Sequence, residues 1–223
     1  MPRTLAVAIA ALALVWVPSA AAARPWTGAD AKDDVQVTPA GPNDACPTDE
    51  TASSEHTATG DLRALGVRRE RDRVVATLRF ADDSTWVRRT VDVHLRTASG
   101  TRDLYAYQPA PATGFDLTVR HLLWWDQEDV DEDGDGETDC QQWVGYTELV
   151  WCEGLVVDPV GRTLTLSVPR SCLGKGHWVK AGADTFGTDD EADGVRLADQ
   201  WGTQSVDDDP RDVVYGPRVR IRG

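Results

Sequence analysis

Residues 90–95 read TVDVHL, a stretch in which polar and apolar residues alternate strictly. A period of two is typical of a β-strand, because successive side chains of a strand point to opposite faces of its sheet. Upstream, Leu62–Val67 and Val74–Phe80 flank the charged turn ERDR, which predicts a β-hairpin. Downstream, Thr163–Val168 (TLTLSV) alternates in the same way and completes a second predicted hairpin.

Other segments are strand-like too, and each is bounded by turn residues. They are Leu104–Tyr107, Phe115–Trp125, Trp143–Val157, Trp178–Phe186 and Val213–Ile221. Helical spacing of apolar residues is nearly absent, and Glu191–Asp199 is its one weak case. Many short strands with almost no helix predict an all-β fold, an antiparallel β-sandwich that resembles a jelly roll.

Length and charge narrow the class of protein further. A chain of 223 residues suits a single domain of this kind. The formal net charge is −14 and the pI is near 4.6, so the surface repels polyanions. We therefore expect neither nucleic acid nor an anionic lipid surface as the main partner.

The first residues have the pattern of an export signal. Arg3 precedes the apolar run Leu5–Val17, which is too short to span a bilayer comfortably, and the small residues SAAAA follow it. We expect a signal peptide over residues 1–23 and a secreted, extracellular protein, with an uncleaved membrane anchor as the alternative. No later stretch is apolar enough to cross a membrane, so the mature chain is not expected to span one.

Residues 24–60 are rich in Ala, Thr, Asp, Pro and Ser and show no periodicity. Such a composition predicts an extended or disordered, flexible lead-in. The β-sandwich domain is expected over residues 61–223, where the strand-like segments recur.

Four cysteines follow the signal: Cys46, Cys140, Cys152 and Cys172. An even number in an exported protein favours two disulfides, and the lack of CxxC or CxH spacing weighs against zinc. The turn DPVGR at 158–162 folds its flanks back on each other, which favours the pair Cys152–Cys172. The remaining pair, Cys46–Cys140, would then attach the lead-in to the sandwich.

The segment DQEDVDEDGDGETD, residues 126–139, holds nine acidic residues and no basic one. Its like charges repel one another, so a compact loop needs a counter-ion. The spacing DxDxDG at 131–136 offers hard oxygen ligands on a tight turn, as calcium requires. It matches the front half of an EF-hand loop, but the twelfth position is Gln142 instead of Glu and the flanks read as strands. We predict a calcium site, with a solvated acidic loop as the alternative. The candidate ligands are Asp129, Asp131, Asp133, Asp135, Glu137 and Asp139.

Tryptophan is unusually frequent, with nine residues. In exported β-sandwiches, Trp rings stack on sugar rings or fill the space between the sheets. Trp124 and Trp125 are neighbours on a predicted strand, so their side chains point to opposite faces and one of them can be exposed. The candidate ligand-binding residues are Trp124, Trp125 and Trp143, with burial in the core as the alternative for each.

Motifs of catalysis are missing: the chain has no HExxH, GxSxG, P-loop or GxGxxG. The histidines are scattered along the chain, and nothing in the sequence predicts that any two meet. Two carboxylates can serve as the catalytic pair of a glycoside hydrolase. The chain has 37 acidic residues, so the presence of such a pair does not distinguish a hydrolase from any other acidic protein. We favour a protein without catalysis and name no catalytic residue.

Several short motifs after Asp61 carry a resemblance. They are DLRALGV at 61–67, Cys152, SVPRSCLG at 167–174 and the acidic segment that runs through Asp199. With these motifs the chain resembles exported actinobacterial β-sandwich proteins of uncharacterised function, which are similar in fold to DOMON-type and family-nine carbohydrate-binding sandwiches. Some DOMON-type proteins bind haem or sugars, but no haem-ligating Met–His pair carries over, because Met1 is the only methionine. The resemblance thus implies the fold and leaves the activity open.

Together these features predict a secreted, calcium-stabilised binding module whose ligand is a glycan or a cell-envelope component. The alternatives are a structural or protein-interaction domain without a small ligand, and a secreted glycoside hydrolase. Exposed Trp side chains favour the first reading and wholly buried ones the second. Two carboxylates about 5–9 Å apart in a cleft favour the third.

Overall fold

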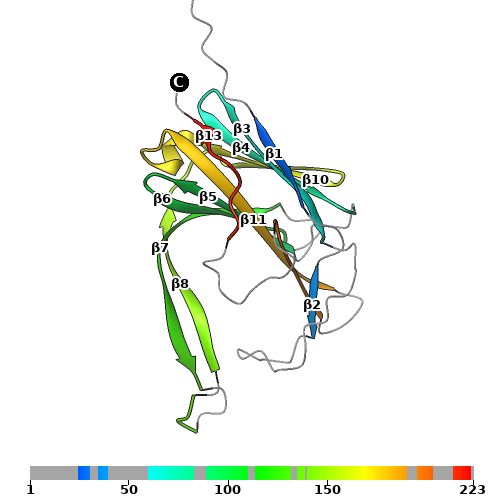
Figure 1. Ribbon diagram of the computed structural model, residues 1–223, viewed down its shortest axis with the longest axis vertical. Helices are drawn as coiled ribbons and strands as arrows, with labels where there is room; N and C mark the ends of the chain where they lie inside the picture. The colour runs from blue at the N-terminus through cyan, green and yellow to red at the C-terminus, as the bar shows by residue number, and fades with distance from the viewer. Residues whose placement is uncertain are drawn as a thin grey trace, which may run out of the picture.

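Two antiparallel sheets pack face to face, as Figure 1 shows. The computed structural model describes residues 25–30, 35–39, 60–82, 89–109, 114–131, 135–138, 140–189, 195–202 and 213–221. The first sheet contains, in spatial order, β1 (Trp26–Ala29), β3 (Leu62–Glu70), β4 (Arg73–Phe80), β10 (Thr163–Pro169) and β9 (Val156–Val160). The second contains β2 (Gln36–Pro39), β12 (Val195–Gln200), β11 (Trp178–Asp189), β5 (Arg89–Thr97), β6 (Gly100–Tyr107), β7 (Asp116–Val130) and β8 (Cys140–Val150), and β13 (Val219–Arg220) pairs with β11. The predicted all-β, antiparallel β-sandwich is confirmed.

The core lies between the sheets and follows the alternation of the strands. On β5, Val91, Val93 and Leu95 are buried against the first sheet, while Asp92 and His94 lie on the outer face. The first sheet contributes the buried residues Leu62, Leu65, Val67, Val74, Ala76, Leu78, Phe80, Leu164, Leu166 and Val168. Burial of this apolar surface, at about 25 cal/mol per Å², is the main force that holds the two sheets together.

The predicted hairpins are confirmed. β3 and β4 pair from Leu62↔Phe80 to Glu70↔Arg73, so the turn falls within the predicted ERDR. β9 and β10 pair around Gly161, whose φ of +54° lies in the left-handed region that favours glycine.

Three segments differ from the prediction. Glu191–Asp199 was the weak helical candidate, and this expectation is wrong where the structure describes it, because Val195–Gln200 forms β12 along the edge of β11. Hydrogen bonds to an existing strand outweigh a weak helical propensity. The predicted stretch Trp143–Val157 divides into two strands in different sheets, and Val213–Ile221 is a strand only over Val219–Arg220.

Two parts of the predicted lead-in belong to the sheets. β1 pairs with β3 and β2 pairs with β12. Each strand has four residues, too few to show a period in the sequence. Trp26 packs edge-to-face against Trp201, with ring centroids 5.2 Å apart, and this contact helps to hold β1 in place. Residues 31–34 and 40–59, and the predicted signal peptide over residues 1–23, lie outside the described residues.

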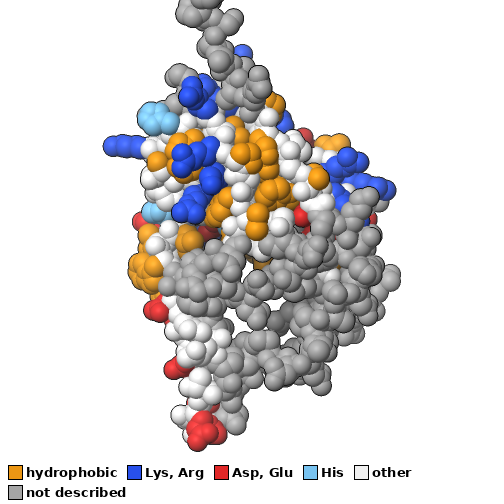
Figure 2. All heavy atoms as spheres, in the orientation of Figure 1, with side chains coloured by type: hydrophobic (Ala, Val, Ile, Leu, Met, Phe, Trp, Pro, Cys, Tyr) orange, Lys and Arg blue, Asp and Glu red, His pale blue; other side chains and the backbone are white. Residues whose placement is uncertain are grey.

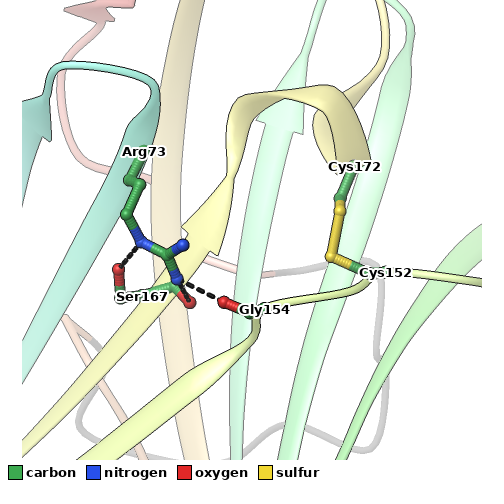
Figure 3. The surroundings of a disulfide bond; sticks show 5 residues. All are labelled: Arg73, Cys152, Gly154, Ser167 and Cys172. Carbon is green, nitrogen blue, oxygen red and sulfur yellow. Dashed lines mark hydrogen bonds between the residues drawn. A yellow bond between two sulfur atoms is a disulfide. The ribbon is translucent and has the colours of Figure 1, made fainter.

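The predicted disulfide Cys152–Cys172 is present (Figure 3). It joins the segment between β8 and β9 to the short 3-10 helix Arg170–Leu173. Beside it, the guanidinium of Arg73 donates hydrogen bonds to the hydroxyl and carbonyl oxygens of Ser167, at 2.6 and 2.8 Å, and to the carbonyl of Gly154 at 2.6 Å. The second predicted pair involves Cys46 and the Cys140 side chain, both outside the described residues.

No helix within the described part of the chain is long and apolar enough to cross a membrane.

Candidate functional site

The β7–β8 hairpin extends away from the rest of the sandwich (Figure 1). β6 pairs with β7 from Asp116 to Leu122, and among the described strands residues 124–130 of β7 pair only with β8. The register shifts between Leu122 and Trp124, which is the position of a β-bulge. Because a bulge adds a residue to one strand, it sets which β7 side chains share a face with those of β8.

This register places Trp124 opposite Tyr146, and the two rings stack. Their centroids are 4.9 Å apart and their planes differ by 19°. The Tyr146 hydroxyl donates a hydrogen bond to Glu128, and this bond raises the pKa of Tyr146 above its ordinary value. The Trp124 side chain remains 54% exposed although one ring face lies against tyrosine. An aromatic surface is therefore presented to solvent on a projecting hairpin.

The other two candidate tryptophans are described only in their backbone. Trp125 pairs with Gly145, and Gln127 pairs with Trp143, so both tryptophans lie in the same part of the hairpin. Their side chains lie outside the described residues.

The described part of the predicted calcium loop uses its carboxylates within the loop. Asp131 accepts a hydrogen bond from the backbone of Gly136 at 2.9 Å, and Asp135 accepts one from the backbone of Glu137 at 2.7 Å. Asp129 accepts a bond from the amide side chain of Gln141 at 2.8 Å. Glu137 is exposed, whereas Asp133 and Asp139 lie outside the described residues. No three described His, Cys, Asp or Glu side chains converge as metal ligands, so the donor set within the described residues is incomplete.

The acidic character of the hairpin extends beyond its tip. Between His121 and Arg162 the chain has no Lys, Arg or His, and Glu148 and Glu153 add to the acidic residues of 126–139. In Figure 2 the far end of the hairpin carries acidic side chains, while the basic ones visible on this face lie on the sandwich body. The hairpin is thus a negative surface with aromatic residues on it.

A second polar cluster, which the sequence did not predict, lies on the outer face of the second sheet. His94 on β5 has Nδ1 2.7 Å from Asp103 on β6 and Nε2 3.0 Å from Asp184 on β11. Burial disfavours a charged imidazole, but the two carboxylates outweigh burial and hold the pKa of His94 well above its ordinary value. Both ring nitrogens are then donors, so His94 has no free nitrogen with which to act as a general base.

Asp92 lies next to this cluster, because β5 and β11 pair Asp92 with Asp184. Burial, and then the charge of Asp184, raise the pKa of Asp92 to about 7. Two neighbouring carboxylates in a partly buried site repel each other, and protonation of one relieves this repulsion.

The C-terminal segment covers part of the cluster, and in Figure 1 it crosses β11 in red. A Cβ on Gly182 would lie 2.5 Å from a Val213 methyl and 2.6 Å from the Val214 carbonyl, so the segment packs directly on β11. Tyr215 hydrogen-bonds Thr101 on β6, and the guanidinium of Arg96 lies 5.7 Å from its ring. The cluster therefore joins three strands and the C-terminal segment.

Sequence reasoning missed these residues for one reason. His94 and Asp92 have the spacing of outward-facing polar residues, which are normally solvated. Only the pairing of β5 with β6 and β11 shows that they meet other charged side chains.

Comparison with known proteins finds no matching family model, no matching curated protein and no matching solved structure. The resemblance to DOMON-type sandwiches stays a prediction.

Proposed function

We propose that this protein is a secreted, non-catalytic binding module that binds a glycan of the cell envelope through its β7–β8 hairpin. The observation that carries the proposal is the Trp124–Tyr146 stack, which leaves the Trp124 side chain 54% exposed. Contiguous exposed apolar surface often marks an interaction site, and here two stacked rings form such a surface on a projecting hairpin.

The chemistry around the stack fits a sugar. The apolar face of a pyranose ring packs against an indole, and tyrosine holds the indole from its other side. Glu128 is held in place by Tyr146, and its carboxylate accepts hydrogen bonds from hydroxyl groups. Because the projecting part of the hairpin, residues 124–147, has no basic residue, we propose a neutral glycan rather than one with uronic acid or phosphate groups.

The acidic residues at the end of the hairpin are the basis for proposing a structural ion in the same module. We propose that calcium binds at residues 129–139 and holds the end of the hairpin together by replacing like-charge repulsion with coordination.

Titration with neutral polysaccharides, followed by tryptophan fluorescence and calorimetry, tests the glycan proposal. We expect saturable binding that is lost in Trp124→Ala. The control is Trp151→Ala, because Trp151 is 88% exposed but is not part of the stack. No binding across a broad glycan array, or equal binding by both variants, would contradict the proposal.

The alternatives predict different surfaces. A structural domain without a ligand has no need for Trp side chains with 54% and 88% exposure. A glycoside hydrolase needs two carboxylates in a cleft that a sugar can enter, whereas Asp103 and Asp184, which contact His94, have side chains that are only 13% and 14% exposed. These observations favour the binding module.

A further inference from the structure

The β8 strand is an open sheet edge that differs from the other described edges. β1 and β9 border the first sheet, and β2 and β8 border the second. β1 and β2 have four residues each, and β9 has five residues with Pro159 among them. β8 has 11 residues and contains neither proline nor lysine. Short strands, proline and lysine protect edges from pairing with other chains, and β8 lacks such protection along its whole length.

Exposed apolar side chains lie beside this edge. Leu149 is 71% exposed and Trp151, just after the end of β8, is 88% exposed. Two residues apart in an extended chain, they point to the same side. Figure 2 shows hydrophobic side chains gathered where the hairpin leaves the sandwich body. Glu148, which directly precedes Leu149, is also exposed and points to the other side of the strand.

The charge of the hairpin indicates which kind of chain fits this edge. On β7, Asp126, Glu128 and Asp129 lie opposite Val144, Gln142 and Gln141 of β8, whereas Arg120 and His121 lie opposite Leu149 and Glu148. An added strand therefore lies beside acidic residues along the outer part of β8, from Gln141 to Val144, and beside Glu148 of β8 itself. A second copy would bring two such acidic hairpins together in a chain of net charge −14, and like-charge contacts oppose this pairing. A basic segment has the complementary charge.

We propose that the open edge of β8 binds an extended, basic polypeptide segment, which adds a strand to the second sheet. Backbone hydrogen bonds to β8 provide the pairing, as in other cases of strand addition. Apolar residues of the segment pack on Leu149 and Trp151. The Lys or Arg residues that alternate with them point to the side on which Glu148 lies. This edge binds a chain through the backbone of β8, whereas the proposed glycan site uses the side chains of Trp124 and Tyr146, so the inference goes beyond the proposed glycan binding.

The test uses the full mature chain and three synthetic eleven-residue peptides. The first alternates Arg with Val, the second has the same sequence with alternate backbone nitrogens methylated, and the third has Glu in place of Arg. We expect calorimetric binding of the first, with affinity at least about tenfold lower for each of the other two. In the complex, hydrogen exchange at the backbone amides of Val144–Val150 should slow.

Two lysine substitutions locate the site. Thr147→Lys, on the exposed part of β8, should weaken binding of the Arg–Val peptide by about tenfold, because an edge lysine opposes strand addition and repels a basic segment. Val160→Lys is the matched control, because Val160 is a 66% exposed residue of the β9 edge. The glycan affinity should be the same in both variants.

Four outcomes overturn the proposal. Equal binding of the methylated peptide means that charge alone attracts it, and equal binding of the Glu peptide removes the charge argument. Equal effects of the two lysine substitutions place the site elsewhere. Concentration-dependent dimers that Thr147→Lys abolishes make a second copy the occupant of the edge.

Discussion

The Nε2 atom of His94 lies 3.0 Å from a carboxylate oxygen of Asp184, although 90 positions separate these residues in the chain. The side chains of both residues are 14% exposed, so the pair is partly shielded from solvent. Because Asp103 contacts the other ring nitrogen, a charged imidazole bridges the two strands on either side of β5. The charge of this imidazole therefore helps to hold β6 and β11 beside β5 in the second sheet.

Stability should fall as the pH rises through about 7. The pKa of Asp92 is raised from 3.8 to about 7 in the folded protein, so its contribution is complete below about pH 4 and is lost by about pH 7. The raised pKa of His94 acts in the same direction. The stability that His94 contributes is complete below pH 6.5 and is lost as the pH rises through the pKa of His94 in the folded protein. Urea unfolding at a series of pH values measures this dependence.

Asp92→Asn provides the comparison. Relative to the wild type, the free energy of unfolding of this variant should be higher at pH 8 than at pH 4, by about 2–4 kcal/mol, since one pKa unit corresponds to about 1.4 kcal/mol. Parallel pH profiles for both proteins would show that Asp92 does not carry the effect.

Gly182→Ala should release the C-terminal segment from β11. The added methyl would meet the Val214 carbonyl at 2.6 Å, and backbone cannot move aside as cheaply as a flexible side chain. We expect a loss of about 1–3 kcal/mol in unfolding free energy and faster hydrogen exchange at Gly216, whose N–H bonds to the Ala181 carbonyl. Gly114→Ala is the control, because no atom of the described residues, apart from its chain neighbours, lies within 4 Å of its Cβ position. Equal losses in the two variants would contradict the packing argument.

Loss of the Cys152–Cys172 bond should destabilise the sandwich by about 2–4 kcal/mol. The bond closes a loop of 20 residues and thereby restricts the unfolded chain. Calorimetry of the double variant Cys152→Ser/Cys172→Ser measures the loss. Peptide mapping without reduction should recover these two cysteines as one linked pair, and free thiols at both positions would rule the bond out.

Calcium should raise the melting temperature at fixed ionic strength. Without the bidentate Glu of an EF-hand, we expect a Kd of roughly 10⁻⁴–10⁻³ M, as in extracellular modules. Free calcium at ten times Kd would stabilise the fold by about 1.4 kcal/mol. The rise should vanish in Asp131→Ala/Asp133→Ala. An equal rise with sodium at matched ionic strength would mean that only screening is at work.

The sequence by itself determined most of the longer strands and, for TVDVHL, which face meets the core. The alternation in TVDVHL predicts a half-buried strand, and Val91, Val93 and Leu95 are indeed the buried residues. The hairpin at ERDR and the pair Cys152–Cys172 were also predictable, because turns and short-range crosslinks depend on residues close together in the chain. These features follow from local geometry, which a single sequence carries.

Only the tertiary structure decided which outward-facing residues meet. His94 reaches Asp184 because β5 pairs with β11 in one register, and a slip of one residue would turn the whole face over. Trp124 stacks on Tyr146 because a bulge after Leu122 shifts the pairing of β7 with β8. Val195–Gln200 is a strand because the edge of β11 offers it hydrogen bonds. Register, bulges and edge pairing depend on contacts between distant segments, and such contacts leave no period in the sequence.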